Sequence, residues 1–342
     1  MLSTQQLATL NAATCEVAYD NLTCQLTPRT PRPIRLCRRR WRFPKVRSRP
    51  APSSGGGRRQ GIAVTPRGAG TGLSGGAIGE GLIIDFAKHQ PPDSLILIRT
   101  AVPSASGRRG AGPAEQLSQA ARIPVRTGRG NQFAATLGGM IANDSSGSHT
   151  PVYGTTGMHV NELQVVLADG SVVKVGPGHD SLQRQRNLVE DLVSLNALKI
   201  TERFPPGLLK RWPGYGLARA LESPQNLLRI LTGSEGTLAA IVSAELKIVP
   251  LPEARGVGLV FFASVTEAMQ ATEKLLELKP AAIEHIDRPL FDQTRGQKEF
   301  QAARDLLQLD SKPCESILIV EFFEDVKERL VLLKKKKLAC AS

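Results

Sequence analysis

The sequence lacks the features of several protein classes. Its 342 residues include five cysteines, an odd number, and no Cys-x-x-Cys pair. We therefore expect no disulfide framework, no metal site within the chain and a reducing compartment. No apolar run reaches the length of about 20 residues that spans a bilayer, and the N-terminus lacks the basic start and apolar run of a signal peptide. We expect a cytoplasmic protein, with a peripheral association at the inner membrane as an alternative.

Aromatic residues are also scarce, at 4%, whereas the formal net charge is +13. The positive charge is concentrated in residues 29–59, in residues 99–129 and in Lys334–Lys337. A basic footprint of this size is typical of nucleic-acid binding. Because no aromatic residues are interleaved with the arginines in a recognisable RNA- or DNA-binding motif, we expect no nucleic-acid partner.

The patterning divides the chain into segments of different character. Residues 1–26 have the spacing of a short helix, and residues 27–60 are rich in Arg, Pro, Ser and Gly, which is typical of irregular structure. A turn signal at 168–171 predicts a hairpin, and Ser264 followed by Glu267 predicts a capping box. Alternation and helical spacing predict strands at 61–65, 81–86, 162–167, 172–175, 239–249, 257–262, 281–286 and 316–322, and helices at 188–203, 264–278 and 326–337.

Three glycine-bearing segments carry the candidate chemistry, and the first is Pro66–Gly76, between two predicted strands. Closely spaced glycines let several backbone N–H groups converge on an anion such as a pyrophosphate. The segment is not a Walker loop, because no Gly-Lys-Ser/Thr follows. It is not a Rossmann fingerprint either, because a strand follows it rather than a helix. The alternative is a flexible glycine loop without a ligand.

The second segment runs from Thr136 to Gly147 and continues at 153–157, and the third is Gly233–Leu238. Paired glycines permit close packing against a planar ligand. Short polar side chains such as that of Asn143 supply hydrogen-bonding groups beside it.

Taken together and in this order, the three segments resemble the FAD-linked oxidase family, which has the vanillyl-alcohol oxidase or PCMH-type flavoprotein fold. The resemblance is nearest to the D-lactate and D-2-hydroxyglutarate dehydrogenase branch, in particular to the N-terminal part of large bacterial members with a C-terminal iron–sulfur domain. It implies an α+β fold, with an FAD-binding domain of two α/β subdomains at 61–252 (irregular over 90–134) and the start of an α+β substrate domain at 253–342.

The resemblance also implies which residues hold the cofactor. The backbone of the first segment would bind the FAD pyrophosphate, the second would line the flavin and its ribityl chain, and the third would lie near the adenosine. The implied contacts are Gly68, Ala69, Gly70, Thr71, Gly72, Leu73, Ser74, Thr136, Leu137, Gly138, Gly139, Asn143, Ser145, Ser146, Gly147, Tyr153, Gly154, Glu235, Gly236 and Ile241. Some relatives attach the flavin through a histidine in the first loop. Because Thr71 occupies that position here, we expect non-covalent FAD.

The implied activity is oxidation of a 2-hydroxy acid, with hydride transfer to flavin N5 and electrons leaving to an acceptor or an iron–sulfur domain outside this chain. The chain ends before the His-rich segment that supplies the base in relatives, so we expect a truncated enzyme and assign no catalytic residue. We expect His149, His159 and His285 to have structural roles. The alternatives are an FAD-binding fragment without turnover, the product of a damaged gene, or the same fold acting on another substrate.

Two stretches have the spacing of the family with the wrong chemistry. Residues 46–60 replace an expected helix with Pro, Gly and Arg, and residues 90–134 are similarly degraded. Interior prolines oppose such a helix, each by about 3 kcal/mol. We interpret these stretches, and the tail after Leu333, as reading-frame slips in a GC-rich gene. Under that hypothesis the net charge of +13 is an artefact of translation.

Overall fold

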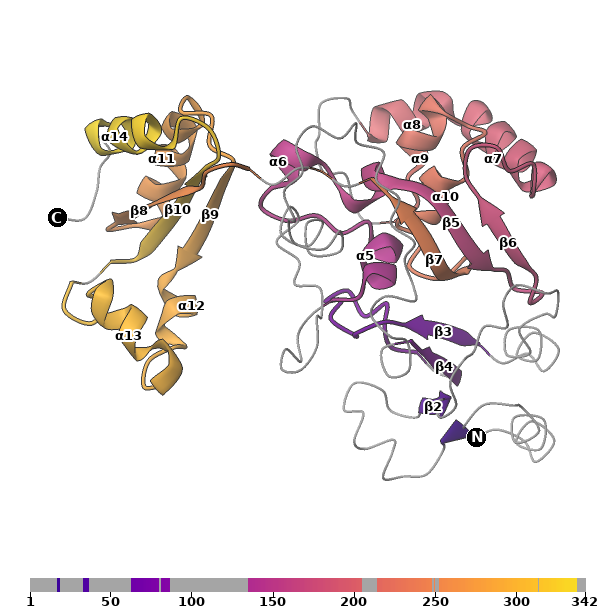
Figure 1. Ribbon diagram of the computed structural model, residues 1–342, viewed down its shortest axis with the longest axis horizontal. Coiled ribbons are helices and arrows are strands. Elements are labelled where there is room, and N and C mark those ends of the chain that lie inside the picture. Colours follow the sequence, from indigo (N-terminus) through magenta and orange to yellow (C-terminus); the bar gives the residue numbers. More distant parts are fainter. Residues whose placement is uncertain are drawn as a thin grey trace. The chain divides into compact units, whose positions relative to one another are not determined.

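The computed structural model describes residues 17–18, 33–36, 63–79, 81–86, 135–204, 214–247, 249, 252–312 and 314–336. They fall into two compact units, each with its own sheets and core (Figure 1). The first unit comprises residues 1–147 and 154–249, and the second comprises 148–153 and 250–342. The second unit therefore takes a short segment from the middle of the first.

One sheet of the first unit has the strand order β1-β2-β4-β3. It consists of β1 (Val17–Ala18), β2 (Pro33–Leu36), β3 (Val64–Arg67) and β4 (Gly81–Asp85). Strands β3 and β4 are parallel, so the glycine-rich residues between them form a crossover rather than a hairpin. Parallel neighbours need a connection of about a dozen residues, and this one contains no helix within residues 68–79.

The beginning of the chain departs from expectation where it is described. Val17–Ala18 form a strand within the stretch expected to be a short helix. Pro33–Leu36 form a strand within the stretch expected to be irregular, and they pair in parallel with β4. Pairing with an existing strand overrides local composition here, because strand formation depends strongly on its neighbours. The two stretches interpreted as frame slips, residues 46–60 and 90–134, lie outside the described residues.

The other sheet of the first unit is antiparallel, with the order β6-β5-β7. Its strands are β5 (Val160–Val166), β6 (Val172–Val175) and β7 (Ala240–Leu246). The predicted hairpin is confirmed: Gly170 has φ 88°, and the backbone N–H of Leu167 donates to the Ser171 carbonyl at 2.9 Å. The helices of this unit are α5 (Leu137–Asn143), the 3₁₀ turn η1 (Thr156–His159), α7 (Gln183–Leu195), α8 (Ala197–Arg203), α9 (Leu217–Glu222) and α10 (Leu228–Leu231).

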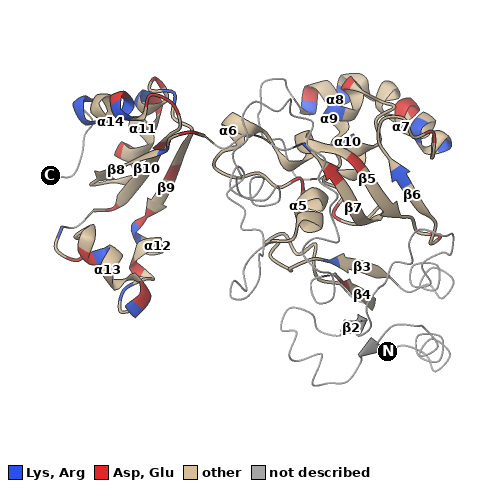
Figure 2. Cartoon of the chain, viewed as in Figure 1, with Lys and Arg blue, Asp and Glu red and all other residues tan. Residues whose placement is uncertain are grey.

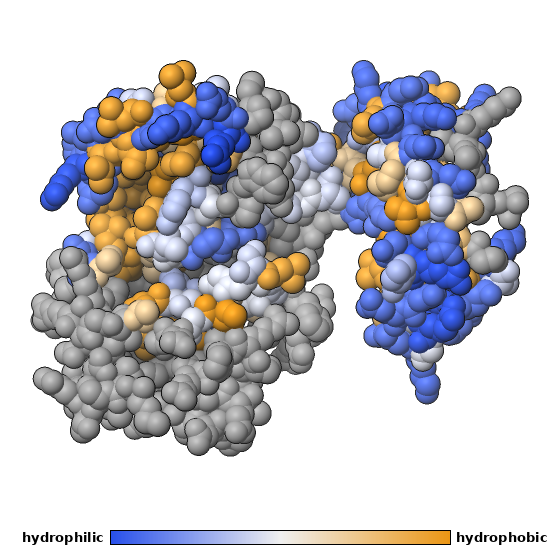
Figure 3. Space-filling view, turned by 180° about the vertical axis from the view of Figure 1, so that it is seen from behind, coloured by the Kyte–Doolittle hydropathy of each residue, from blue (hydrophilic) through white to orange (hydrophobic). Residues whose placement is uncertain are grey.

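The helix predicted over 188–203 is two helices, α7 and α8, which meet at Asn196. Exposed leucines follow both of them, and Figure 3 shows apolar residues gathered over this part of the surface. The exposed leucines are Leu188, Leu192, Leu195 and Leu198. The hydrophobic spacing predicted helical structure here, but it did not indicate which of these leucines are buried and which are exposed to solvent.

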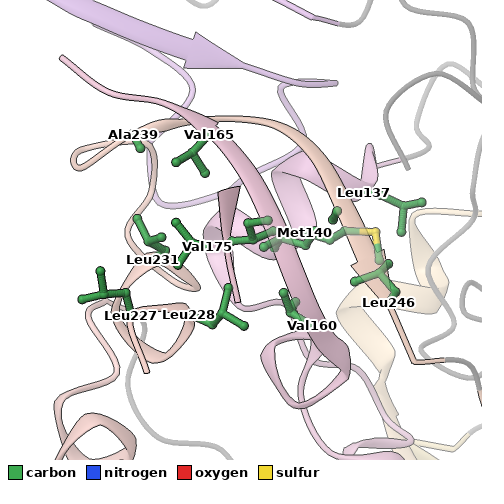
Figure 4. Close-up of a cluster of buried hydrophobic side chains, with 13 residues drawn as sticks. Leu137, Met140, Val160, Val165, Val175, Leu227, Leu228, Leu231, Ala239 and Leu246 are labelled. Atoms are coloured by element: carbon green, nitrogen blue, oxygen red, sulfur yellow. The ribbon is translucent and has the colours of Figure 1, made fainter. Parts of the chain in front are cut away.

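The core of the first unit places α5 against the antiparallel sheet (Figure 4). Leu137, Met140 and Ile141 lie on one side of α5, as the spacing i, i+3, i+4 requires. They pack with buried residues of the strands and of α10. The position of α5 is therefore fixed by its apolar residues, and other residues of the helix, among them Gly138 and Asn143, line a cavity.

Charge in the described residues is mixed in sign. Figure 2 shows acidic and basic residues together on α7, α8 and α13. The arginine-rich stretches that dominate the net charge lie outside the described residues, apart from strand β2.

The second unit is a three-stranded antiparallel sheet with helices. Strand β10 (Ser316–Phe322) lies between β8 (Gly256–Phe262) and β9 (Ala282–Asp287). The helices are α6 (Thr150–Tyr153), α11 (Val265–Leu276), α12 (Arg288–Asp292), α13 (Lys298–Leu306) and α14 (Val326–Lys335). The predicted helix start is confirmed, because the Ser264 hydroxyl accepts a hydrogen bond from the Glu267 N–H at 3.2 Å. Phe262, Leu275 and Leu318 are central to the core of this unit.

Helix α14 approaches strand β8 closely because β8 carries glycine at the contact. A β-carbon added at Gly258 would lie 2.2 Å from Leu333 Cδ2, and one added at Gly256 would lie 2.3 Å from Val326 Cγ1. We expect Gly258→Val to destabilise the protein by about 1–3 kcal/mol through overpacking, measured by urea unfolding. Val257→Leu is the matched control, because Val257 is 52% exposed on the same strand. Equal unfolding midpoints for the two variants would contradict the close packing.

Candidate functional site

A cavity of about 400 Å³ lies within the first unit, and all three glycine-bearing segments line it. Its size is within the range of small-molecule sites, about 300–1,000 Å³. The predicted contacts that line it are Gly68, Ala69, Gly70, Thr71, Gly72, Leu73, Ser74, Thr136, Gly138, Gly139, Asn143, Ser145, Glu235, Gly236 and Ile241. Residues as far apart in the sequence as Gly68 and Ile241 are thus brought to one place.

The first segment packs directly on the start of α5. A β-carbon at Gly68 would lie 2.0 Å from Thr136 Oγ1, so no residue larger than glycine fits there without movement. Thr136 is the N-cap of α5, and its hydroxyl accepts from the Gly139 N–H at 3.3 Å. Capping of this kind satisfies one of the free donors in the first helical turn. This contact therefore fixes the position of the first glycine-bearing segment relative to the second.

The third segment touches the first at two points. A β-carbon at Gly236 would lie 2.9 Å from Pro66 Cγ, and one at Gly76 would lie 2.8 Å from Glu235 Oε2. Gly236 also has φ 77°, in the left-handed region that glycine adopts without strain. The third segment therefore lies directly against the first, and residues of both line the cavity.

The third segment also supplies hydrogen-bond donors to the C-terminal end of helix α5. The carbonyls at the C-terminus of a helix have no partners within the helix. Here the Ile141 carbonyl accepts from the Gly233 N–H at 3.0 Å, and the Ala142 carbonyl accepts from the Glu235 N–H at 2.9 Å. Every pair of the three segments is therefore in direct contact.

Two glycines of the cavity wall have free space in front of them. A β-carbon at Gly72 or at Gly138 would meet nothing within 4 Å, although both residues line the cavity. The absence of side chains there keeps the space open for a ligand that needs close backbone approach. The donor set is mainly backbone N–H groups with short hydroxyl and amide side chains, which suits a dinucleotide.

An ion pair that the sequence did not reveal supports the far end of α5. Asp144 ends the helix in the left-handed conformation, with φ 47°. Its Oδ2 lies 2.7 Å from the Arg219 guanidinium, and its Oδ1 accepts from the Gly157 N–H at 2.7 Å. Both side chains of the pair are mostly buried, at 15% and 17% exposure. No local pattern indicates that Arg219 is the partner of Asp144.

A second buried ion pair lies at the first wall. Arg67 lines the cavity, and its guanidinium lies 3.1 Å from the Asp85 carboxylate. The two residues belong to the adjacent parallel strands β3 and β4. Arg67 lies in the first glycine-bearing segment, but the sequence did not predict it as a site residue.

Five predicted contacts lie elsewhere. Leu137 is buried in the core and does not line the cavity. Tyr153 belongs to the second unit. A β-carbon at Gly154 would lie 2.3 Å from Met158 Sδ, so that glycine serves packing within the chain. Ser146 and Gly147 do not line the cavity.

Glu235 is the acidic residue of the third wall, and burial raises its pKa above the usual value. A carboxyl whose pKa is raised on folding contributes stability that is present below the unfolded pKa and is lost as the pH rises through the folded pKa. We therefore expect the melting temperature of the FAD-free protein to fall more steeply between pH 4.5 and 7 than that of Glu235→Gln. Differential scanning fluorimetry across this range measures the effect. Parallel curves for the two proteins would contradict it.

The histidines expected to be structural are placed away from this cavity. His285 Nε2 lies 2.6 Å from Ser316 Oγ, between neighbouring strands, and His149 pairs with Glu321 at 2.7 Å. Cys314 is a buried free thiol, and burial raises its pKa. Within the described residues, no three His, Cys, Asp or Glu side chains cluster as metal ligands would. Among the helices described, none is both long and apolar enough to cross a membrane.

Two family matches cover separate parts of the chain. Residues 57–176 match the family described as FAD binding domain. Residues 251–336 match the family described as FAD linked oxidases, C-terminal domain. The order of the two matches is the order of the two units along the chain, apart from the segment at 148–153.

Several curated proteins are similar over most of this chain. D-2-hydroxyglutarate dehydrogenase of Haemophilus influenzae is 28% identical over 300 residues, which cover 79% of this chain and 28% of that protein. D-lactate dehydrogenase of Archaeoglobus fulgidus is 30% identical, over 66% of this chain and 42% of that protein. The chain thus spans about a quarter to two fifths of the length of these relatives. A solved alkyldihydroxyacetonephosphate synthase aligns with a TM-score of 0.49 and 17% identity, over 82% of this chain and 48% of that one.

Proposed function

Because the chain belongs to the FAD-linked oxidase family, we propose that it binds FAD in the cavity of the first unit and is part of a D-2-hydroxyacid dehydrogenase. The observation that carries the proposal is the direct contact among all three glycine-bearing segments around one cavity. The predicted α+β fold, with a PCMH-type FAD-binding domain followed by residues of the substrate domain, is the fold of this family.

Different residues of the cavity would bind different parts of FAD. The backbone of Gly68–Ser74 holds the pyrophosphate, since a turn of glycines offers N–H groups without side chains in the way. Asn143 and Ser145 supply polar side chains at the end of α5, where the Asn143 amide donates to the Ser145 hydroxyl at 3.0 Å. Gly236 and Ile241 also line the cavity. When bound, FAD supplies a two-electron acceptor for the oxidation of a substrate carbon.

Relatives of the hydroxyacid branch guide the choice of substrate class. Both relatives compared above carry names of dehydrogenases for D-2-hydroxy acids. A substrate of this class requires a base for the hydroxyl proton and a cation for the carboxylate. We assign neither to a residue of this chain, and the electron acceptor belongs to another chain or domain.

The lining of the cavity favours non-covalent FAD. Thr71 lies in the wall formed by the first loop, and the described lining residues include no histidine, cysteine or tyrosine able to form a stable flavin bond. We expect acid precipitation of the purified protein to leave intact FAD in the supernatant, measured by its absorbance and fluorescence. Flavin that remains with the precipitate would contradict this prediction.

A visible spectrum followed by substrate addition tests the function as a whole. We expect flavin bands in the protein reconstituted with FAD, and bleaching of those bands by D-2-hydroxyglutarate or D-lactate under anaerobic conditions. Flavin bands that no 2-hydroxy acid bleaches would indicate an FAD-binding fragment without turnover. A colourless protein that takes up no added FAD would overturn the proposal.

A further inference from the structure

The loop of residues 145–156 begins and ends in the first unit, but its tip belongs to the second. Two hydrogen bonds close its base: the Ser145 carbonyl accepts from the Thr156 N–H at 3.0 Å and from the Thr156 hydroxyl at 2.7 Å. Ser145 and Thr155, one at each end of the loop, both line the flavin cavity. Any force on the loop therefore acts on two residues of the cavity wall.

The tip is held by a buried pair of side chains. His149 Nε2 lies 2.7 Å from the Glu321 carboxylate, and the two side chains are 0% and 4% exposed. Glu321 lies in the central strand β10, 172 residues further along the chain. The contact therefore joins a loop that begins at the flavin cavity to the middle of the sheet of the second unit.

Aromatic rings surround this pair. The ring of Phe323 lies 5.1 Å from that of His149 and 6.1 Å from that of Tyr153, and the Arg255 guanidinium lies 5.4 Å from the Phe323 centroid. Apolar contacts of this kind exclude water but are not directional, so the rings can shift relative to one another. A short hydrogen bond, in contrast, fixes the relative position of its two partners. The His149–Glu321 pair is a directional contact of the second kind.

The chemistry of the pair makes each partner depend on the other. The Nδ1 atom of His149 is buried and has no hydrogen-bond partner among the described residues. Loss of the Glu321 carboxylate would therefore leave the whole imidazole buried without a polar partner, which is costly. The least costly response is for His149 to leave its place, and the loop would move with it.

We propose that His149 and Glu321 are positioning residues that clasp the loop of residues 145–156 to the second unit, and thereby hold Ser145 and Thr155 in the geometry that binds FAD. This inference rests on the proposed function in one respect only, namely that the ligand of the cavity is FAD. Because coupling between two sites is reciprocal, FAD in the cavity would in turn strengthen the hold of the loop on β10.

The first test measures FAD affinity in the full chain by quenching of flavin fluorescence. We expect Glu321→Ala to weaken binding about tenfold, within the usual range of coupling, and Glu321→Gln to recover to within about threefold, because its amide oxygen still accepts a hydrogen bond. The matched control is Glu162→Ala. Glu162 also pairs with a histidine, His179, at 2.7 Å, and neither residue lines the cavity. The control should bind FAD within about twofold of wild type.

The second test does not need FAD. We expect hydrogen exchange at the Thr156 amide to rise about tenfold in Glu321→Ala, with the Leu167 amide of the β5–β6 hairpin unchanged as an internal reference for global unfolding. Unchanged exchange at Thr156, or unchanged FAD affinity in Glu321→Ala, would overturn the clasp. If wild type takes up no FAD, the proposed function fails and the exchange result still decides the clasp.

Discussion

Gly138→Leu is expected to weaken FAD binding roughly a hundredfold while leaving the FAD-free protein at least as stable as wild type. Gly138 is in the first turn of α5 and lines the cavity, and a β-carbon there meets no protein atom within 4 Å. Leucine favours helix over glycine by up to about 0.8 kcal/mol, so folding does not suffer. The new side chain would occupy ligand space, and an overlap that costs about 3 kcal/mol corresponds to roughly a hundredfold loss of affinity.

Flavin fluorescence titration and urea unfolding measure the two effects separately. The matched control is Ser194→Leu, which adds the same side chain at an exposed position of α7, away from the cavity. We expect the control to bind FAD as wild type does. Normal FAD affinity in Gly138→Leu would show that the ligand does not lie against α5.

Asp144→Ala is expected to destabilise the first unit by about 3 kcal/mol or more. The substitution leaves the mostly buried Arg219 guanidinium and the Gly157 N–H without their acceptor. It also places alanine at φ 47°, which costs about a further 1 kcal/mol. Because Asp144 lines the cavity, FAD affinity should fall as well.

Asp144→Asn separates the charge from the hydrogen bond. The asparagine carbonyl can still accept from the Gly157 N–H, and asparagine tolerates the left-handed conformation, so we expect a smaller loss of about 1–2 kcal/mol. Asp191→Ala, at an exposed position of α7, should change the free energy of unfolding by less than about 0.5 kcal/mol. Urea unfolding followed by circular dichroism compares the three variants. Equal effects of Asp144→Ala and Asp191→Ala would refute the role of the buried pair.

The strands were the most predictable part of the fold. A short continuous apolar run predicts a strand buried on both faces, and β10, which is buried along nearly its whole length, has the bounds predicted for it, Ser316–Phe322. Helix α5 was not predicted, because Gly138 and Gly139 are poor helix formers in so short a segment. It is stabilised by partners that local sequence does not reveal, among them the N–H groups of Gly233 and Glu235.

The residues of the cavity could be predicted where the local sequence itself shows which residue type is needed. Glycine at positions 68, 76 and 236 is needed because another segment lies against the backbone, and the density of glycine signals this in the sequence. The motif alone did not predict helix α5, and the helix places the Leu137 side chain in the core. The pairing of Asp144 with Arg219 depends on the folded path of the chain, and no pattern in either neighbourhood predicts it.

The interleaving of the two units has a consequence for dissecting the protein. A gene fragment that begins at residue 250 would encode strands β8, β9 and β10 and helices α11 to α14 of the second unit, but not α6 or His149. Its Glu321 carboxylate would lack the imidazole that faces it, and the surface normally covered by residues 148–153 would be bare. A fragment that ends at residue 249 would retain the loop with nowhere for its tip to dock. The boundary at residue 250 is therefore a place where the chain crosses between the units, and a faithful separation would require a designed graft rather than a cut.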